Sequence, residues 1–541
     1  MAQIRINAVI AIYVCLVAAF IADNWLAGTQ PNLMRWPDAG WVAGTSATRA
    51  GLDHERLGRS VQRLPAIRFL RMLGNSARIL LGQRLEWIVW GEQKEVPVLA
   101  PKNELGVSRG LGDQAIKANL DHLIKRLDQY SKKLQAEGWK LYIVPVPTKL
   151  SVYREYFPWP LQDTDQLSRQ QIDADHSDEL FAYLGRELIS REVRFVDLQA
   201  PFRKTSLDHP GQWLYPPGES HWSGRGLDIA AQVTAEYIAQ TSKVTYVDQP
   251  VTPEIPVIHI GDIVRSMDAF PVLIGRYRPI YHFSESLKRW PLYIPGADKP
   301  PAADASLVVV LGTSYTGHYG WLVGEPVGFA QAVGAHLHHA AIYQISQTGI
   351  GGFHPFRTFL GRKEELVQDF GQRTGQAEDR IQKIVVWEFP IRDFGYLTAH
   401  SEAWVMRIDN PYGLENHLER QLFWLGPAPA TVAVFASEDG MIEFSADLQP
   451  GPARRPGANC TLMITNEAGQ EFRHHVVPGP NRIRIPVQAG ANRLSWRSPE
   501  PAEILPPYAN GDPRTLMLSV FDLKLSYEQG AGPHSALAPV N

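Results

Sequence analysis

Apolar positions in the middle of the chain alternate between the spacing of an amphipathic helix and the continuous run of a buried strand. Leucine and isoleucine recur at helical spacing between residues 115 and 135, and the run LYIVPV at 141–146 predicts a buried strand. The same order recurs downstream, with helices expected at 178–189 and 226–239 and strands expected at 193–198, 307–311, 340–345 and 384–387. Alternating helices and strands are typical of an α/β domain with a mostly parallel sheet.

The pattern changes near residue 426, where helical spacing disappears. Short β-like runs separated by Gly, Pro, Asn and Asp are expected at 431–435, 441–446, 460–465, 471–476, 482–486, 492–496 and 516–525. Short strands of this kind predict a β-sandwich. We therefore expect a lead-in region at 31–100, an α/β domain at 101–425 that contains a Pro-rich excursion at 245–306, and a β-sandwich at 426–541.

The N-terminus begins with an apolar segment. Arg5 precedes the run Ala8 to Ala22, and Asp23 ends it, so residues 1–30 read as a signal anchor or transmembrane helix. The bulky Phe20 at the −3 position disfavours cleavage after Ala22, and we favour an uncleaved anchor over a cleaved signal peptide. A positive charge before the segment places the rest of the chain outside the cytoplasm. We expect a periplasmic protein anchored in the inner membrane.

Composition narrows the function classes. The chain has 541 residues, of which 44% are hydrophobic and 20% charged, and a net charge of −3 gives no reason to expect nucleic-acid binding. Its two cysteines, Cys15 and Cys460, form no C-x-x-C motif, and the sequence has no H-E-x-x-H motif, so no metal site is predicted. No glycine-rich nucleotide-binding loop is visible either, and we expect no cofactor.

The first candidate for chemistry is a serine that directly follows a predicted central strand. In VVVLGTSY at 308–315, the strand runs into Gly312, Thr313 and Ser314. A serine in this place lies at the carboxyl end of the sheet, where α/β proteins carry their sites. Ser314 is therefore a candidate nucleophile whose own amide could contribute to an oxyanion hole. A structural turn serine is the alternative.

The second candidate is the loop YPPGESHWSGRG at 215–226. In extended chain, residues two apart point to the same side, so Glu219 could orient the imidazole of His221. The other ring nitrogen would then be free to accept a serine proton. Ser223 could cap the following helix. A surface Glu–His pair is the alternative for this motif when it is considered alone.

Together these segments resemble the alginate O-acetyltransferases of the AlgJ and AlgX type. ESHWSGRG resembles their D-x-H-W motif and VLGTSY their G-[DT]-S-Y nucleophile motif, in the same chain order. Further similar segments are YIVPVPTK at 142–149, GIGGF at 349–353 and VWEFPIRDF at 386–394. The resemblance covers roughly residues 100 to 400, and the chain departs from it by having Glu219 where the family usually has Asp.

The resemblance implies an SGNH-hydrolase-like three-layer fold with circularly permuted motif order and a carbohydrate-binding-module-like β-sandwich. It implies that Ser314 attacks an acetyl donor, that His221 is the general base, and that Glu219 orients His221. Candidate oxyanion groups are the amides of Ser314 and Gly351. Candidate substrate-binding residues, for which core or salt-bridge roles are the alternative, are Tyr319, Trp321, Trp222, Lys149 and Arg392.

Three functions are compatible with these residues. The first is a periplasmic O-acetyltransferase that modifies an exopolysaccharide and receives acetyl groups from a membrane-bound O-acyltransferase within a polymer-secretion complex. The second is a carbohydrate acetylesterase with the same triad, because water and a sugar hydroxyl compete for the same acyl-enzyme. The third is a non-catalytic polysaccharide-binding scaffold, for which the Glu219 departure is the best support.

Overall fold

The computed structural model defines most of the chain beyond the first 70 residues. It describes residues 72, 75, 76, 85, 88–94, 96–162, 171–242, 244–246, 254–267, 282–288, 306–323, 327–338, 340–347, 353–394, 403–417, 420–455, 457–505 and 512–527. The expected N-terminal anchor at 1–30 lies outside these residues. Within the described part of the chain, no helix is both long enough and apolar enough to cross a membrane.

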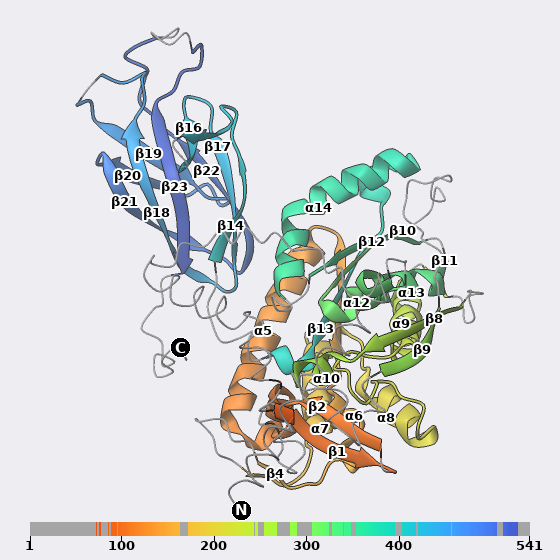
Figure 1. The fold of residues 1–541 in the computed structure, drawn as a ribbon. Helices are drawn as coiled ribbons and strands as arrows, with labels where there is room; N and C mark the ends of the chain where they lie inside the picture. The colour runs from red at the N-terminus through yellow and green to blue at the C-terminus, as the bar shows by residue number, and fades with distance from the viewer. Residues whose placement is uncertain are drawn as a thin grey trace, which may run out of the picture.

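A five-stranded parallel sheet forms the centre of the first domain (Figure 1). Its strands, in spatial order, are β12 (Ala340–Ser346), β10 (Ser306–Gly312), β13 (Lys383–Pro390), β3 (Trp139–Val146) and β6 (Arg194–Phe195). The predicted strands at 141–146, 307–311, 340–345 and 384–387 are all confirmed. The one expected at 193–198 is reduced to the two residues of β6, which pair with Tyr142 and Ile143.

Alternate residues of these strands face two separate hydrophobic cores, as a sheet covered on both faces requires. Val308, Val310 and Val386 lie in one core, whereas Leu307, Val309 and Val385 lie in the other. The first core packs against α8 (Gln199–Asp208), α9 (Gly224–Thr241), α12 (Ser314–Val323) and α13 (Phe329–His336). The second packs against α5 (Gln114–Ala136), α7 (Ser177–Ile189) and α14 (Phe353–Thr374). The expected three-layer α/β fold is therefore present.

The first domain also contains smaller elements around the central sheet. Two antiparallel pairs are β1 (Ile88–Gln93) with β2 (Val96–Pro101), and β8 (Glu254–Ile260) with β9 (His282–Lys288). Two shorter pairs are β4 (Leu161–Gln162) with β5 (Gln171–Ile172), and β7 (Thr245–Tyr246) with β11 (Leu337–His338). The short helices are α4 (Leu105–Ser108), α6 (Lys149–Val152) and α10 (Asp262–Ser266). The Pro-rich excursion at 245–306 thus contains ordered elements, one of which reaches the candidate site described below.

The C-terminal part of the chain forms two five-stranded antiparallel sheets around a third core. One sheet contains β14 (Ala403–Asp409), β17 (Ala430–Ala436), β22 (Gly490–Arg497), β19 (Cys460–Thr465) and β20 (Glu471–Val476). The other contains β15 (Leu414–His417), β16 (Arg420–Leu425), β23 (Leu518–Tyr527), β18 (Gly440–Pro450) and β21 (Gly479–Val487). All seven predicted runs are strands, but β14, β15 and β16 place the start of this domain before residue 426.

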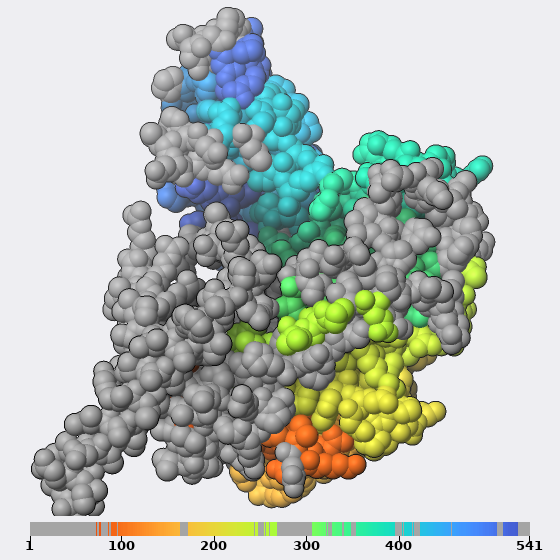
Figure 2. Space-filling model, turned by 45° about the vertical axis from the view of Figure 1, so that its right-hand side comes forward, coloured from red at the N-terminus to blue at the C-terminus, as the bar shows by residue number. Residues whose placement is uncertain are grey.

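The two domains meet through one face of the C-terminal β-domain. In Figure 2 the cyan and blue residues of this domain form a lobe of their own, which adjoins the green region of the first domain. Phe435 on β17 is fully buried and packs against Tyr130 of α5 and Phe356 of α14, with ring centroids 5.7 and 6.4 Å apart. Tyr130 also donates a hydrogen bond to the Ser437 carbonyl (2.9 Å). This contact couples the β-domain to the helical layer formed by α5, α7 and α14.

We expect Phe435→Ala to lower the free energy of unfolding by about 3 kcal/mol or more, because it leaves a cavity among buried aromatic rings. Urea unfolding followed by circular dichroism measures the change. Phe472→Ala on β20, where the ring is only partly buried, is the control and should cost less. Equal losses in the two variants would contradict a special role for Phe435 in joining the domains.

Candidate active site

Ser314 begins helix α12 immediately after β10, as the sequence predicts. The turn between them is tight: a Cβ added to Gly312 would lie 1.8 Å from Thr316 Oγ1 and 2.6 Å from Glu388 Oε2, so no other residue fits there without rearrangement. Ser314 is partly exposed, and its N–H belongs to the first turn of the helix, where N–H groups have no partner within the helix. The turn therefore presents both a hydroxyl and an N–H at the carboxyl edge of the sheet.

The buried carboxyl group of Glu388, on β13, forms hydrogen bonds to the residues of this turn. Glu388 accepts hydrogen bonds from Thr313 N (2.9 Å), Thr313 Oγ1 (2.9 Å) and Thr316 Oγ1 (2.7 Å). Its side chain is completely buried, and burial raises the pKa of Glu388 to about 7 despite these three donors. Glu388 thus holds the residues on both sides of Ser314 and carries little negative charge below neutral pH.

Glu388 should make the stability of the fold fall as the pH rises. Its pKa is about 7 in the folded protein against an ordinary 4.5, so the folded state binds the proton more tightly than the unfolded state. The stabilisation is complete below pH 4.5 and is lost as the pH rises to about 7, by roughly 3 kcal/mol. Glu388→Gln should remove this part of the decline in a urea-unfolding series from pH 5 to 8. An unchanged decline would contradict the assignment.

The loop that carries Glu219 and His221 is held by a buried lysine. Lys149 follows β3 and donates hydrogen bonds to the carbonyls of Pro216 (2.5 Å), Pro217 (2.8 Å) and Glu219 (3.1 Å). Its side chain has no exposed surface, and burial lowers the pKa of Lys149 to about 7. From the other side, Leu99 N on β2 donates to the Pro217 carbonyl (2.9 Å). The loop is therefore fixed through its backbone.

Glu219 and His221 form a hydrogen-bonded pair. Glu219 Oε1 lies 2.6 Å from His221 Nδ1, and because an ionised carboxylate only accepts, Nδ1 carries the proton and Nε2 is left as the acceptor. Burial favours neutral forms of both groups, but their mutual hydrogen bond and attraction outweigh it. The pKa of Glu219 is therefore well below its ordinary value, and the pKa of His221 is raised above 6.5. This is the orientation that a general-base histidine requires.

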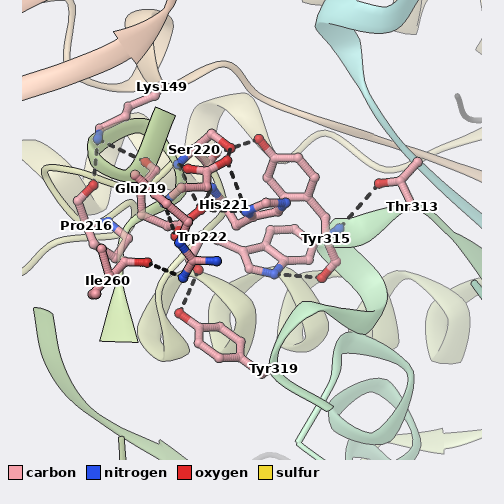
Figure 3. A network of polar contacts seen from close by, with 12 residues as sticks. Lys149, Pro216, Glu219, Ser220, His221, Trp222, Ile260, Thr313, Tyr315 and Tyr319 are labelled. Atoms are coloured by element: carbon pink, nitrogen blue, oxygen red, sulfur yellow. Dashed lines mark hydrogen bonds and ion pairs between the residues drawn. The ribbon is translucent and has the colours of Figure 1, made fainter. Parts of the chain in front are cut away.

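Three hydrogen bonds join this loop to helix α12, which begins with Ser314. Tyr315 Oη donates to the Ser220 carbonyl (2.7 Å), Trp222 Nε1 donates to the Tyr315 carbonyl (3.0 Å), and Tyr319 Oη donates to the Trp222 carbonyl (2.9 Å). Figure 3 shows the rings of Tyr315 and Trp222 lying between the two segments. Residues next to the candidate nucleophile and base thus set the distance between them.

Ser314 and His221 are brought into the same neighbourhood. The His221 ring stacks on His318 with centroids 4.3 Å apart and lies 5.0 Å from the ring of Tyr315. His318 is one helical turn beyond Ser314, on the same face of α12. Among the described residues no hydrogen bond joins Ser314 Oγ to His221. Catalytic hydrogen bonds are often long in a free enzyme and shorten when substrate binds.

The other predicted site residues have mixed placements. Tyr319 and Trp222 are buried, and their polar atoms donate hydrogen bonds to backbone carbonyls. These contacts fit a role in core packing, the alternative to substrate binding for these residues. All three donors of Lys149 are used within the protein. Arg392 is mostly buried and donates to Glu104 Oε1 (3.1 Å) and Tyr315 Oη (3.0 Å), which is the salt-bridge alternative. Gly351 and the side chain of Trp321 lie outside the described residues.

Sequence reasoning missed four charged or titratable residues of this region. These are Glu104, Asp262, His318 and Glu388. Glu388 and Arg392 occur within the segment at 386–394 that resembles the family, and His318 lies one turn after Ser314, so both signals were available. Glu104 comes from the first residues of the α/β domain and Asp262 from the Pro-rich excursion, and no motif distinguishes either residue.

Side-chain atoms of Glu219, His221 and His318 lie within 4.8 Å of one another, the kind of grouping that can hold a metal ion. The Glu219 carboxylate, however, accepts from His221 Nδ1, from the amides of Ser220 (3.0 Å) and His221 (3.2 Å), and from Asp262 N (2.9 Å). A metal would have to displace these donors. The arrangement is therefore suited to holding a proton on His221 rather than a cation.

The sequence matches a known protein family over about half of its length. Residues 109–391 match the family model described as the SGNH hydrolase-like domain of the acetyltransferase AlgX. The chain is 22% identical over 306 residues to the probable alginate O-acetylase AlgJ of Pseudomonas fluorescens, a match that covers 54% of this chain and 66% of that protein, just under two thirds.

Two solved structures are also similar. The O-acetyltransferase domain of Pseudomonas putida AlgJ has 19% identity and a TM-score of 0.36, and the match covers 57% of this chain and 92% of that one. AlgX of Pseudomonas aeruginosa has 14% identity and a TM-score of 0.33, and the match covers 75% of this chain and 88% of that one.

Proposed function

We propose that this chain, which belongs to the SGNH hydrolase-like acetyltransferase family of AlgX, transfers acetyl groups to hydroxyls of a secreted polysaccharide through an acetyl-serine intermediate. The observation that carries the proposal is the Glu219–His221 pair, with its 2.6 Å contact at Nδ1, joined by hydrogen bonds to the helix that begins with Ser314. Glutamate in place of the usual aspartate is compatible with the role, because its carboxylate reaches Nδ1.

In the first half-reaction, Ser314 Oγ attacks the carbonyl carbon of an acetyl donor. The hydroxyl proton passes to His221 Nε2, and the negative charge of Glu219 stabilises the imidazolium that forms. In this proposal the N–H of Ser314, in the first turn of α12, donates to the oxyanion, and Gly351 is the second donor. Collapse of the tetrahedral intermediate breaks the bond to the leaving group, which takes the proton from His221. Acetyl-serine and neutral His221 remain.

In the second half-reaction, a sugar hydroxyl attacks the acetyl-serine. His221 Nε2 accepts the hydroxyl proton, the new ester bond forms, and the proton returns to Ser314 Oγ as it leaves. Both halves need one base that alternates between neutral and protonated states. The raised pKa of His221 supports this role, because it reflects the stabilisation of the protonated imidazole by Glu219, which both half-reactions need.

The wider setting of the reaction belongs to the same proposal. An N-terminal anchor would place the enzyme in the periplasm, where acetyl-CoA is absent, so the donor would be an acetyl group delivered by a membrane-bound O-acyltransferase. The polymer would be alginate or another exopolysaccharide in a secretion complex, and the C-terminal β-domain would hold it. The AlgJ relative, described as a probable alginate O-acetylase, supports alginate as the first acceptor to test.

The test is an acetyl-transfer assay with the purified chain. The protein is incubated with a chromogenic acetyl ester, with and without uronic-acid or glucan oligosaccharides, and the sugars are analysed by mass spectrometry. A sugar-dependent gain of one acetyl group is the expected result and identifies the acceptor class. Ester cleavage that never yields acetylated sugar would instead favour the acetylesterase. Oligosaccharide binding without either reaction would favour the scaffold.

A further inference from the structure

A second carboxylate lies against the Glu219–His221 loop, from a part of the chain that carries no recognisable motif. Asp262 is the first residue of α10, directly after β8 and Gly261. Its Oδ1 accepts from Ser220 N (2.6 Å), and its Oδ2 accepts from Ser220 Oγ. Its own N–H donates to Glu219 Oε2 (2.9 Å). Asp262 therefore contacts both residues that precede His221.

The close approach of these two segments depends on Gly261. A Cβ at this position would lie 2.1 Å from the Gly218 carbonyl oxygen, which no side chain could accommodate without a shift. Val264 N also donates to the same carbonyl (3.2 Å). The excursion is thus held directly against the loop, and Asp262 is delivered to a fixed position beside it.

The Asp262 carboxylate also faces the imidazole. Its Oδ2 is 3.8 Å from His221 Nδ1, so a second carboxylate lies close to the nitrogen that Glu219 contacts. The other charged or titratable groups that face this point are Glu219 on the same loop, His318 and Tyr315 on α12, Arg392 after β13, and Lys149 after β3. Burial, followed by repulsion from Glu219, raises the pKa of Asp262, although 41% of its side chain is exposed.

We infer that Asp262 is a positioning residue of this site, which fixes Glu219 and Ser220 and shares the stabilisation of protonated His221. The inference rests on the proposed function, since it assigns Asp262 to the same base. The inference also assigns a role to the Pro-rich excursion. Its Asp262 N–H donates to Glu219 Oε2 and so holds the carboxylate in place, while Oε1 contacts His221.

Two substitutions separate charge from hydrogen bonding. Asp262→Asn keeps a group of the same shape that can still accept from Ser220 N, but removes the negative charge, whereas Asp262→Ala removes both. Glu254→Gln, at the exposed start of β8, changes the net charge equally and is the control. We expect kcat/KM for acetyl-ester turnover to fall about 10-fold in Asp262→Asn and up to about 100-fold in Asp262→Ala, with Glu254→Gln unchanged.

The decisive readout is the titration of His221, which needs no turnover. Histidine-labelled protein is followed by NMR from pH 5 to 9, and the His221 signal is assigned with His221→Gln. Loss of the Asp262 charge should lower the pKa of His221 by on the order of half a unit or more, and should move the acidic limb of the kcat/KM profile to lower pH by the same amount. If Asp262 only supported the loop, its substitution would lower activity but leave the pKa of His221 unchanged.

An unchanged His221 titration in Asp262→Asn would overturn the inference, as would wild-type kcat/KM in both variants. Thermal melting shows whether each variant folds. If Asp262→Ala does not fold, the result for Asp262→Asn alone tests the inference. The two hypotheses fail separately: a wild type without acetyl transfer or ester cleavage contradicts the proposed function, whereas an active wild type with indifferent Asp262 variants contradicts only this inference.

Discussion

Ser314→Ala is expected to lower acetyl transfer by about 1000-fold or more, because in the proposed mechanism it removes the atom that carries the acetyl group between donor and acceptor. The fold should survive. Ser314 is partly exposed at the start of α12, and the turn around it is held by the contacts of Glu388 with Thr313 and Thr316. Mass spectrometry of the protein after incubation with donor alone should show one added acetyl group in the wild type and none in the variant.

Ser346→Ala is the matched control. Ser346 ends β12 and lies opposite Gly312 in the register with β10, so it is a serine at the same edge of the same sheet. Its replacement should leave acetylation of the protein and of sugar unchanged. Retention of the acetyl-protein adduct in Ser314→Ala would show that another residue is the nucleophile and would contradict the proposed mechanism.

Glu219→Gln should lower kcat by about 100- to 10,000-fold while leaving the fold intact. The amide can present an N–H to His221 Nδ1, which would stabilise the tautomer with its proton on Nε2, the atom that must accept from Ser314. The charge that stabilises the imidazolium is lost as well. Since Glu219 raises the pKa of His221, the acidic limb of the kcat/KM profile should move to lower pH.

Glu219→Asp tests the family difference directly. Aspartate keeps the charge but is one methylene shorter, and the contact of 2.6 Å at Nδ1 and the contact of 2.9 Å from Asp262 N cannot both persist without movement of the loop. We expect a smaller loss than in Glu219→Gln and little change in the acidic limb. Equal losses in the two variants would mean that geometry, rather than charge, is what Glu219 supplies.

The sequence was sufficient to predict the sheet, because each central strand is a continuous apolar run with a helical pattern on either side. Val308, Val310 and Val386 face one core and their neighbours the other, which such runs require. The start of the β-domain was harder to locate. The strands β14 to β16 lie between 403 and 425, where polar residues interrupt the alternation, and their pairing with distant strands decides their place.

For the site, the sequence placed Ser314, Glu219 and His221 but not their supports. The pair two residues apart is a local feature, so extended geometry alone predicts its contact. Asp262 reaches Ser220 from 42 positions away and Glu388 reaches Thr313 from 75 positions away, and neither contact leaves a local pattern. Tyr319 and Trp222 illustrate the opposite error, since aromatic residues beside a nucleophile can equally fill the core.

The position of Lys149 has a consequence for chemical selectivity. An amine with a pKa of about 7 is a strong nucleophile at neutral pH, and an enzyme that carries an activated acetyl group risks acylating its own lysines. Lys149 is completely buried, and each of its three protons is donated to a carbonyl oxygen of the loop that bears His221. Its lone pair becomes available only if the ammonium group gives up one of those bonds. In the proposed acetyl transfer, the burial and hydrogen bonds of Lys149 keep this amine from competing with hydroxyl groups for the acetyl group.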